Sequence, residues 1–364
     1  MRIDLASRVD ISSHLSQRLS VFGIVNAMLI VLIHSTPIPM KGTWQWWLVE
    51  VLGRDGICRI AVPYFFLVGG FFLAGHVCEE RWWLHEVRKR LRSLAIPYFL
   101  WIIIGLFVNS VFWVGIQWYG VSCGFANPFY GPIHLWLINT FGLSPFQNEI
   151  GILWFVRNLF VLVVISPLLL LIIKHIGFSF VILIFTIYCC AVVLEVNIDK
   201  GWFNFLEYYV SIRGLCYFTL GIVLRYIHVC DNGLQFVKKR LFLVLGSMGV
   251  LLKILCMSYG YLGLAAIFDV IMVPVLGFGV FYALERVRFP SWLTRNAFPI
   301  YLLHQVFLLF SIVILTLLGL RGMMNTSIVI WVLRFVFALT LSFVSTILLR
   351  NYMPNVSRLL LGGR

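Results

Sequence analysis

Ten long apolar segments, separated by shorter polar ones, occupy most of the chain. Each approaches the roughly 20 residues that an α-helix needs to cross the hydrocarbon core of a bilayer. Lipid favours helices because a helix satisfies its own backbone hydrogen bonds. The pattern therefore predicts an all-α, polytopic integral membrane protein with about ten transmembrane helices, at residues 19–36, 57–75, 94–116, 151–173, 178–195, 210–226, 241–258, 262–284, 297–319 and 328–350.

Apart from a long outer loop at about 117–150, the segments between these spans are short, so we expect a single transmembrane domain over residues 1–364 with no appended soluble domain. A shorter apolar stretch at 133–143 is expected to be re-entrant or interfacial. The first 18 residues are polar, and no small-residue cleavage site follows the first apolar segment. We therefore expect the first span to be a permanent signal-anchor.

Composition agrees with this interpretation. Hydrophobic residues make up 61% of the chain and charged residues only 12%, about half the share usual in soluble domains. The net charge of +14 does not indicate nucleic-acid binding, because the cations stand in short clusters between apolar runs. The eight cysteines are scattered and form no C-x-x-C motif, so we interpret them as apolar helix residues and expect no metal site.

Lys and Arg alternate across the loops between the predicted spans. With the N-terminus in the cytoplasm, 19 of the 28 basic residues fall on the inner side. The outer loops hold only Lys41, Arg54, Lys200 and Arg321. Because positively charged loops are retained in the cytoplasm, this asymmetry predicts an even number of spans with both termini cytoplasmic.

Charged residues also occur within the spans, namely Arg59, Arg157, Arg213, Lys253, Asp269 and Arg334. The predicted orientation puts all of them, and His34 at the end of the first span, in the outer part of the membrane. Buried charges must pair or line water, so we expect a polar chamber open to the outer face. The alternative is that each cation extends separately to the headgroups. For Lys253 and Asp269, on consecutive helices, we expect a structural ion pair, whereas Arg213 and Arg334 are open between substrate contact and scaffold.

Four segments together resemble the acyltransferase 3 family of multi-pass membrane enzymes, which includes the O-acetylases of surface polysaccharides. In chain order they are RIAVPYFFLVGGFFLAG (59–75), VRKRLRSLAIPYFLW (87–101), ILWFVRNLFVLVVISPLL (152–169) and FPIYLLHQ (298–305). His34 takes the place of the histidine that closes the family's first span. Two positions depart from the pattern: Gly23 stands where the family usually has an arginine, and Gly69 where it has a serine. Arg18 is the candidate substitute for the missing arginine.

The resemblance implies transfer of an acyl group from a thioester to a sugar hydroxyl. That reaction needs a base for the hydroxyl proton and cations for the tetrahedral oxyanion. His34 is the candidate base or acyl carrier, since an imidazole titrates near neutral pH. Arg59 and Arg157 are the candidates for stabilising the developing negative charge. On residue type alone, His34 is equally compatible with a structural histidine at a helix end.

The resemblance also implies a cytoplasmic acyl-CoA donor, with acetyl-CoA as the expected co-substrate. Arg88, Arg90 and Arg92, beside Lys89, are candidates for binding its phosphates, although the same cluster is explained by topology alone. Tyr301 and His304 are candidates for substrate contact, and so is Arg213, for which a scaffold role stays the alternative. His304 lies about seven residues into its span, roughly 10 Å from the inner face, and is expected to fall well short of His34 in depth.

The implied acceptor is a glycan or lipid-linked sugar, and the implied location is the bacterial inner membrane, in contact with its lipids. Aromatic residues of 42–50 and 117–150 suit sugar stacking, but equally suit an interfacial belt. The competing functions are a transporter or polymerase of lipid-linked glycans, which also needs a polar chamber, and a non-catalytic homologue, which Gly23 suggests. No internal repeat of the kind common in transporters is visible.

Overall fold

The computed structural model describes residues 11–35, 42–77, 81–118, 152–197, 211–230 and 239–363. These residues form helices joined by turns, with no strand among them. The α-helices are α1 (Ser13–Ser35), α2 (Trp44–Val49), α3 (Ala61–Ala74), α4 (Trp82–Arg90), α5 (Ile96–Trp118), α7 (Trp154–Val164), α8 (Ser166–Ile176), α9 (Phe178–Asn197), α11 (Ile212–Cys230), α12 (Lys239–Ser258), α13 (Leu262–Ala283), α14 (Ser291–Thr294), α15 (Ala297–Leu317), α16 (Ile328–Tyr352) and α17 (Pro354–Leu360).

Shorter helical pieces extend several of these elements. The π-helical segments η1 (Glu50–Arg54) and η3 (Leu91–Ala95) precede α3 and α5, and the 3₁₀ segment η2 (Ile57–Ile60) leads directly into α3. Two further 3₁₀ segments, η5 (Leu284–Arg286) and η6 (Arg321–Asn325), follow α13 and α15. Among the described residues, every apolar segment expected to cross the membrane coincides with helix, which confirms the predicted all-α fold.

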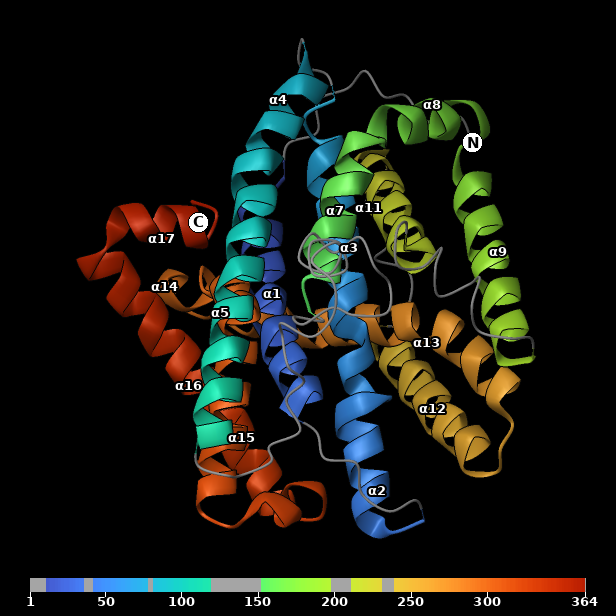
Figure 1. Cartoon of the computed structure of the whole chain (residues 1–364). Helices are drawn as coiled ribbons and strands as arrows, with labels where there is room; N and C mark the ends of the chain where they lie inside the picture. The colour runs from blue at the N-terminus through green and yellow to red at the C-terminus, as the bar shows by residue number, and fades with distance from the viewer. Residues whose placement is uncertain are drawn as a thin grey trace.

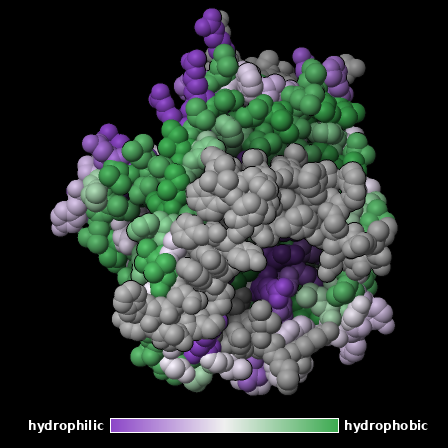
Figure 2. Space-filling view, in the orientation of Figure 1, coloured by the Kyte–Doolittle hydropathy of each residue, from purple (hydrophilic) through white to green (hydrophobic). Residues whose placement is uncertain are grey.

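Seven described helical runs are long and apolar enough to cross a membrane, or up to eight if a bent pair is counted as one span. The predicted count of ten spans and the cytoplasmic placement of both ends stay predictions. Among the residues that Figure 2 colours, hydrophobic ones predominate in the upper and left parts of the face, while hydrophilic ones lie at its margins and inside a hollow. An apolar outer surface is expected where a protein contacts the hydrocarbon core of the membrane. The stretch 133–143, expected to be re-entrant, lies outside the described residues.

The segment expected as one span at 151–173 is instead broken into α7 and α8, which meet at an angle of 62°. Figure 1 shows α8 lying across the upper end of α7. Pro167 stands at the first turn of α8, where its missing N–H is tolerated, and its ring disfavours helical backbone at the preceding residue. The Ser166 hydroxyl donates to the carbonyl of Val163 across the break at 2.7 Å. The Ser-Pro pair therefore explains the bend.

α1 is the central helix of the described part and packs against α3, α15 and α16 (Figure 1). α3 packs in turn on α11, where two glycines allow the backbones to approach closely. A Cβ added at Gly221 would lie 1.9 Å from the Leu67 carbonyl oxygen, and one at Gly70 2.0 Å from that of Phe218. Small residues are the usual means of close helix packing in membranes, where no hydrophobic effect drives helices together. Arg59 lies in η2 directly before α3, and Arg213 lies at the start of α11.

Candidate functional site

The two histidines singled out from the sequence lie against each other. The imidazole rings of His34, at the end of α1, and His304, in the first half of α15, have centroids 5.3 Å apart. His34 is exposed, whereas His304 is completely buried. The accessible imidazole of His34 therefore lies beside the shielded imidazole of His304.

This arrangement corrects the expected depth of His304, which was to fall well short of His34. That expectation assumed that all helices begin at the same level. In the structure Ala297 and Ile300, at the start of α15, share a packing cluster with Ile24, Ala27 and Val31 in the middle of α1. Because α15 begins beside the middle of α1, its second turn reaches the end of α1, where His34 is.

The surroundings of His304 determine which nitrogen carries its proton when the ring is neutral. Nδ1 lies 2.7 Å from the carbonyl oxygen of Tyr301 and 3.2 Å from that of Ile300. Since both neighbours are acceptors, Nδ1 must be the donor. Nε2 is then an acceptor, and it is buried without a hydrogen-bond partner among the described residues. Buried polar atoms are rarely left unsatisfied, and the exceptions are often functional.

Arg334 of α16 links the end of α1 to α15. Its Nη1 donates to the carbonyl oxygen of Ser35 at 3.3 Å, and its Nε donates to the Ser311 hydroxyl at 3.1 Å. A cation suits this position, because the last carbonyls of a helix carry partial negative charge. Arg334 was open between substrate contact and scaffold, and these contacts give it a scaffold role next to His34.

Tyr301 lies one turn before His304 and is buried. Its hydroxyl donates to the carbonyl oxygen of Ile152, just before α7, and its ring centroid is 5.6 Å from that of Phe155. These contacts tie α15 to the segment that carries Arg157. Substrate contact by Tyr301 stays a prediction.

Arg59 belongs to a second polar group, formed around Asp269. The Asp269 carboxylate accepts from Arg59 Nη2 at 2.9 Å and Nε at 3.3 Å, and from Lys253 Nζ at 2.6 Å. Asp55 lies 3.6 Å from Arg59 and 3.5 Å from Lys253. The structure confirms the predicted ion pair between Lys253 and Asp269. It adds Arg59 and Asp55, which makes the four-residue cluster electrically balanced.

Arg213 of α11 lies near this cluster. Its Nε donates to the hydroxyl of Tyr188 in α9 at 2.8 Å, and it is within electrostatic range of Arg59 and Asp269. Tyr188 was not predictable from the sequence, because a lone tyrosine in an apolar helix has no distinctive neighbours. Arg334 thus lies with His34 in one polar group, and Arg59, Lys253 and Arg213 lie around Asp269 in another. A single chamber joining them stays a prediction.

Arg157 is half-buried on α7. The next residue, Asn158, fixes this part of the helix, since its side-chain oxygen accepts from the backbone N–H of Ser211 at 3.0 Å. The catalytic assignments of Arg157 and Arg59 are not tested by these contacts.

The basic residues proposed for the donor lie on α4 and η3. Arg88 and Arg92 are exposed, whereas Arg90 is half-buried and its Nε donates to Glu86 at 3.3 Å. Glu86 is completely buried, and its other oxygen accepts from Lys89 Nζ at 3.2 Å. Sequence reasoning missed Glu86, although its spacing of three and four residues to two cations is the usual signature of helical ion pairs. Phosphate binding by Arg88, Arg90 and Arg92 stays a prediction.

The two positions that depart from the family pattern have distinct surroundings. A Cβ at Gly23 would be 3.6 Å from the Tyr64 hydroxyl, which is ordinary contact. A Cβ at Gly69 would be 2.7 Å from Leu159 Cδ1, so Leu159 occupies the space that a serine would need. Arg18, the candidate substitute for an arginine at position 23, packs its guanidinium 4.4 Å from the ring centroid of Phe281. Whether Arg18 acts in place of that arginine stays a prediction.

Within the described part of the chain, no three His, Cys, Asp or Glu residues are placed to hold a metal ion. Comparison with protein families gives one match: the family model described as an acyltransferase domain matches residues 24–348. Comparisons with curated proteins and with solved structures gave no match. The matched range includes both histidines and both polar groups.

Proposed function

The chain belongs to the acyltransferase 3 family and is a multi-pass membrane acyltransferase, and we propose that it moves an acyl group from acyl-CoA to a sugar hydroxyl. The acceptor is a cell-surface or lipid-linked glycan, the donor is acetyl-CoA, and the location is the bacterial inner membrane. The observation that supports this proposal is the contact between His34, at the end of α1, and His304, in the first half of α15, both within the matched range.

In this proposal His34 removes the proton of the sugar hydroxyl. The hydroxyl oxygen attacks the thioester carbonyl, a C–O bond forms, and the tetrahedral intermediate collapses with cleavage of the C–S bond. The proton then passes from His34 to the CoA thiolate, so that no other reactant is required. His34 suits this task because it is exposed and therefore accessible to a substrate.

His304 is the positioning residue for His34. Because its Nδ1 is occupied by two backbone carbonyls, its Nε2 is the acceptor available to an N–H of His34. Such a bond holds the His34 ring in one tautomer, with the other nitrogen free to take the substrate proton. Arg334 supports the same geometry by fixing the end of α1.

Positive charge for the oxyanion comes in this proposal from Arg157 and Arg59. Asp269 pairs with Arg59 and offsets its charge. Arg59 therefore stabilises the oxyanion only to the extent that this ion pair loosens when substrate binds. The donor enters from the predicted inner face. There, the exposed Arg88 and Arg92 are accessible to the nucleotide phosphates.

Acetyl transfer from radiolabelled acetyl-CoA to membrane glycans tests the function directly. His34→Ala should lower kcat by roughly 10²–10⁴-fold, the usual contribution of a general base. His304→Asn keeps a donor for the two carbonyls but removes the Nε2 atom, and should lower kcat, shift the pH profile and leave KM unchanged. His175→Ala, an exposed histidine at the end of α8, is the matched control. Normal turnover by His34→Ala in correctly inserted protein would refute the assignment.

A further inference from the structure

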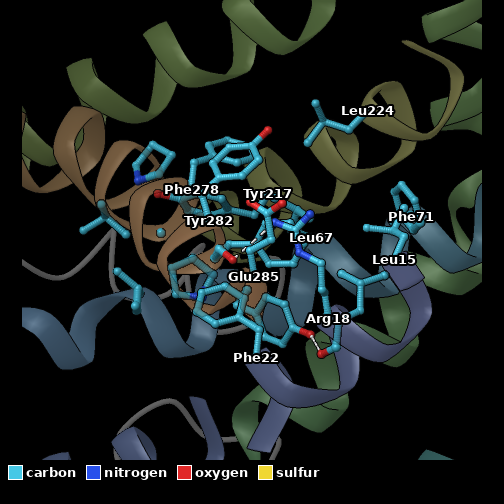
Figure 3. A pocket seen from close by; sticks show the side chains of 18 of the residues that line it. Leu15, Arg18, Phe22, Leu67, Phe71, Tyr217, Leu224, Phe278, Tyr282 and Glu285 are labelled. Carbon is cyan, nitrogen blue, oxygen red and sulfur yellow. Dashed lines mark hydrogen bonds between the residues drawn. The ribbon is translucent and has the colours of Figure 1, made fainter. Parts of the chain in front are cut away.

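A cavity of about 560 Å³ lies between α1, α3, α11 and α13, apart from the two histidines. Figure 3 shows the side chains that line it. Most of the residues that line it are apolar or aromatic, among them Phe22, Leu67, Phe71, Val273 and Phe278. Polar groups stand mainly towards the start of α1, namely His14, Arg18, Tyr282 and Glu285. The cavity is thus an apolar slot with one polar end.

The slot is long enough for a chain. On α3 it extends from Pro63 to Phe71, eight residues along the helix, which corresponds to about 12 Å at 1.5 Å per residue. Along this length the lining has few polar groups for a ligand to bond, and the Tyr64 hydroxyl already donates to the carbonyl oxygen of Leu19. A chain with buried amides would leave them unsatisfied, whereas a hydrocarbon chain has none to satisfy.

Arg18 supplies the charge at the polar end. Its guanidinium lies over Phe281 and makes one hydrogen bond, from Nη2 to the Phe281 carbonyl oxygen at 3.4 Å. Its Nε is buried and has no hydrogen-bond partner among the described residues. Glu285, which also lines this end, and Arg288 are both within electrostatic range and act on Arg18 with opposite signs, Glu285 more strongly. Most of the five donors of this guanidinium therefore remain for an anion, and phosphate is the anion whose geometry it fits best.

We propose that this cavity binds one hydrocarbon chain of a phosphate-headed, anionic lipid, with the phosphate at Arg18. The predicted orientation puts Arg18 on the cytoplasmic side, where anionic lipids give the membrane its negative surface potential. The chain would fill the space between α13 and the α1–α3 pair, so the lipid holds these helices together. This site is separate from the proposed acyl transfer.

Gly277 provides a direct test of the chain. It lines the cavity, and a Cβ added there meets no atom within 4 Å, so we expect the side chain of Gly277→Leu to occupy the slot. Gly115→Leu is the matched control, because a Cβ at this α5 glycine also meets nothing within 4 Å and Gly115 does not line the cavity. Both changes replace a helical glycine and should not lower stability.

The purified full chain is reconstituted in nanodiscs of phosphatidylcholine, with or without phosphatidylglycerol. Retained lipid is measured by native mass spectrometry and stability by thermal unfolding. Phosphatidylglycerol should be retained by the wild type and raise its Tm. Gly277→Leu should lose both effects, and Arg18→Gln should weaken retention about tenfold, because a charge-assisted hydrogen bond is lost. Gly115→Leu and Arg286→Gln, an exposed arginine outside the cavity, should behave as wild type.

Equal retention of phosphatidylglycerol by Gly277→Leu and wild type would overturn the proposal. So would an outcome in which Gly277→Leu abolishes acetyl-CoA binding but leaves the lipid in place, since the cavity would then belong to the donor. Neither measurement needs turnover. A failed lipid site therefore remains distinguishable from a failed acyl-transfer activity.

Discussion

Asp269 holds two cations in the membrane-embedded part of the protein, and its charge is predicted to be essential for stability. Asp269→Asn keeps the shape of the side chain but leaves Lys253 and Arg59 facing a neutral amide. Lys253 and Asp269 are shielded, with side chains only 6% and 12% exposed. Removing one partner of a buried pair leaves the other charge buried without a counter-charge. This lowers the free energy of unfolding far more than losing a surface pair does.

The structure sets the size of the effect. Three hydrogen bonds to the carboxylate become weaker, at 2.6, 2.9 and 3.3 Å, while Asp55 remains at 3.5 Å from Lys253 and 3.6 Å from Arg59. Because Asp55 compensates only in part, we expect Asp269→Asn to lower the free energy of unfolding by about 3–5 kcal/mol. Arg54→Gln removes the ion pair that the exposed Arg54 makes with Asp55 at 3.7 Å, and should cost less than about 1 kcal/mol.

Reversible unfolding in mixed micelles of mild detergent and dodecyl sulfate measures both changes. The double variant Lys253→Met with Asp269→Asn should recover at least about 1 kcal/mol relative to the additive expectation, since it removes one of the stranded cations. A cost below about 1 kcal/mol for Asp269→Asn, or strict additivity in the double variant, would refute the reasoning and indicate that the cluster is hydrated.

Two further predictions concern helix packing and the geometry at His34. Gly221→Ala should destabilise the protein by about 1–3 kcal/mol or more in the same assay, because its Cβ would be 1.9 Å from a backbone oxygen, whereas Gly115→Ala should be neutral or stabilising. Equal stabilities would contradict the close α3–α11 packing. Arg334→Met should lower kcat for acetyl transfer about tenfold at normal protein level, because the end of α1 loses its anchor to α16. An unchanged kcat would remove Arg334 from the support of His34.

The helices of this protein follow from the sequence alone. An apolar run of sufficient length has to form a helix in lipid whatever surrounds it, so each predicted span is helical. The Lys253–Asp269 pair was also predictable, because short connections place consecutive helices side by side and isolated charges in lipid seek partners. The break at Ser166–Pro167 carried a local signal, the proline itself, which a count of apolar residues overlooks.

Contacts between helices distant in sequence were decided only by tertiary packing. The meeting of His34 with His304 depends on how far α15 is shifted along α1, which is set by interlocking side chains such as Ile24, Ala27 and Ile300. Hydropathy predicts how long each helix is, but not how far it is shifted along its axis relative to a helix distant in sequence. Lipid is equally favourable to all apolar surfaces and so does not select one shift. The lipid-sized cavity beside Arg18 arises in the same way, from four helices that no pattern within any one of them brings together.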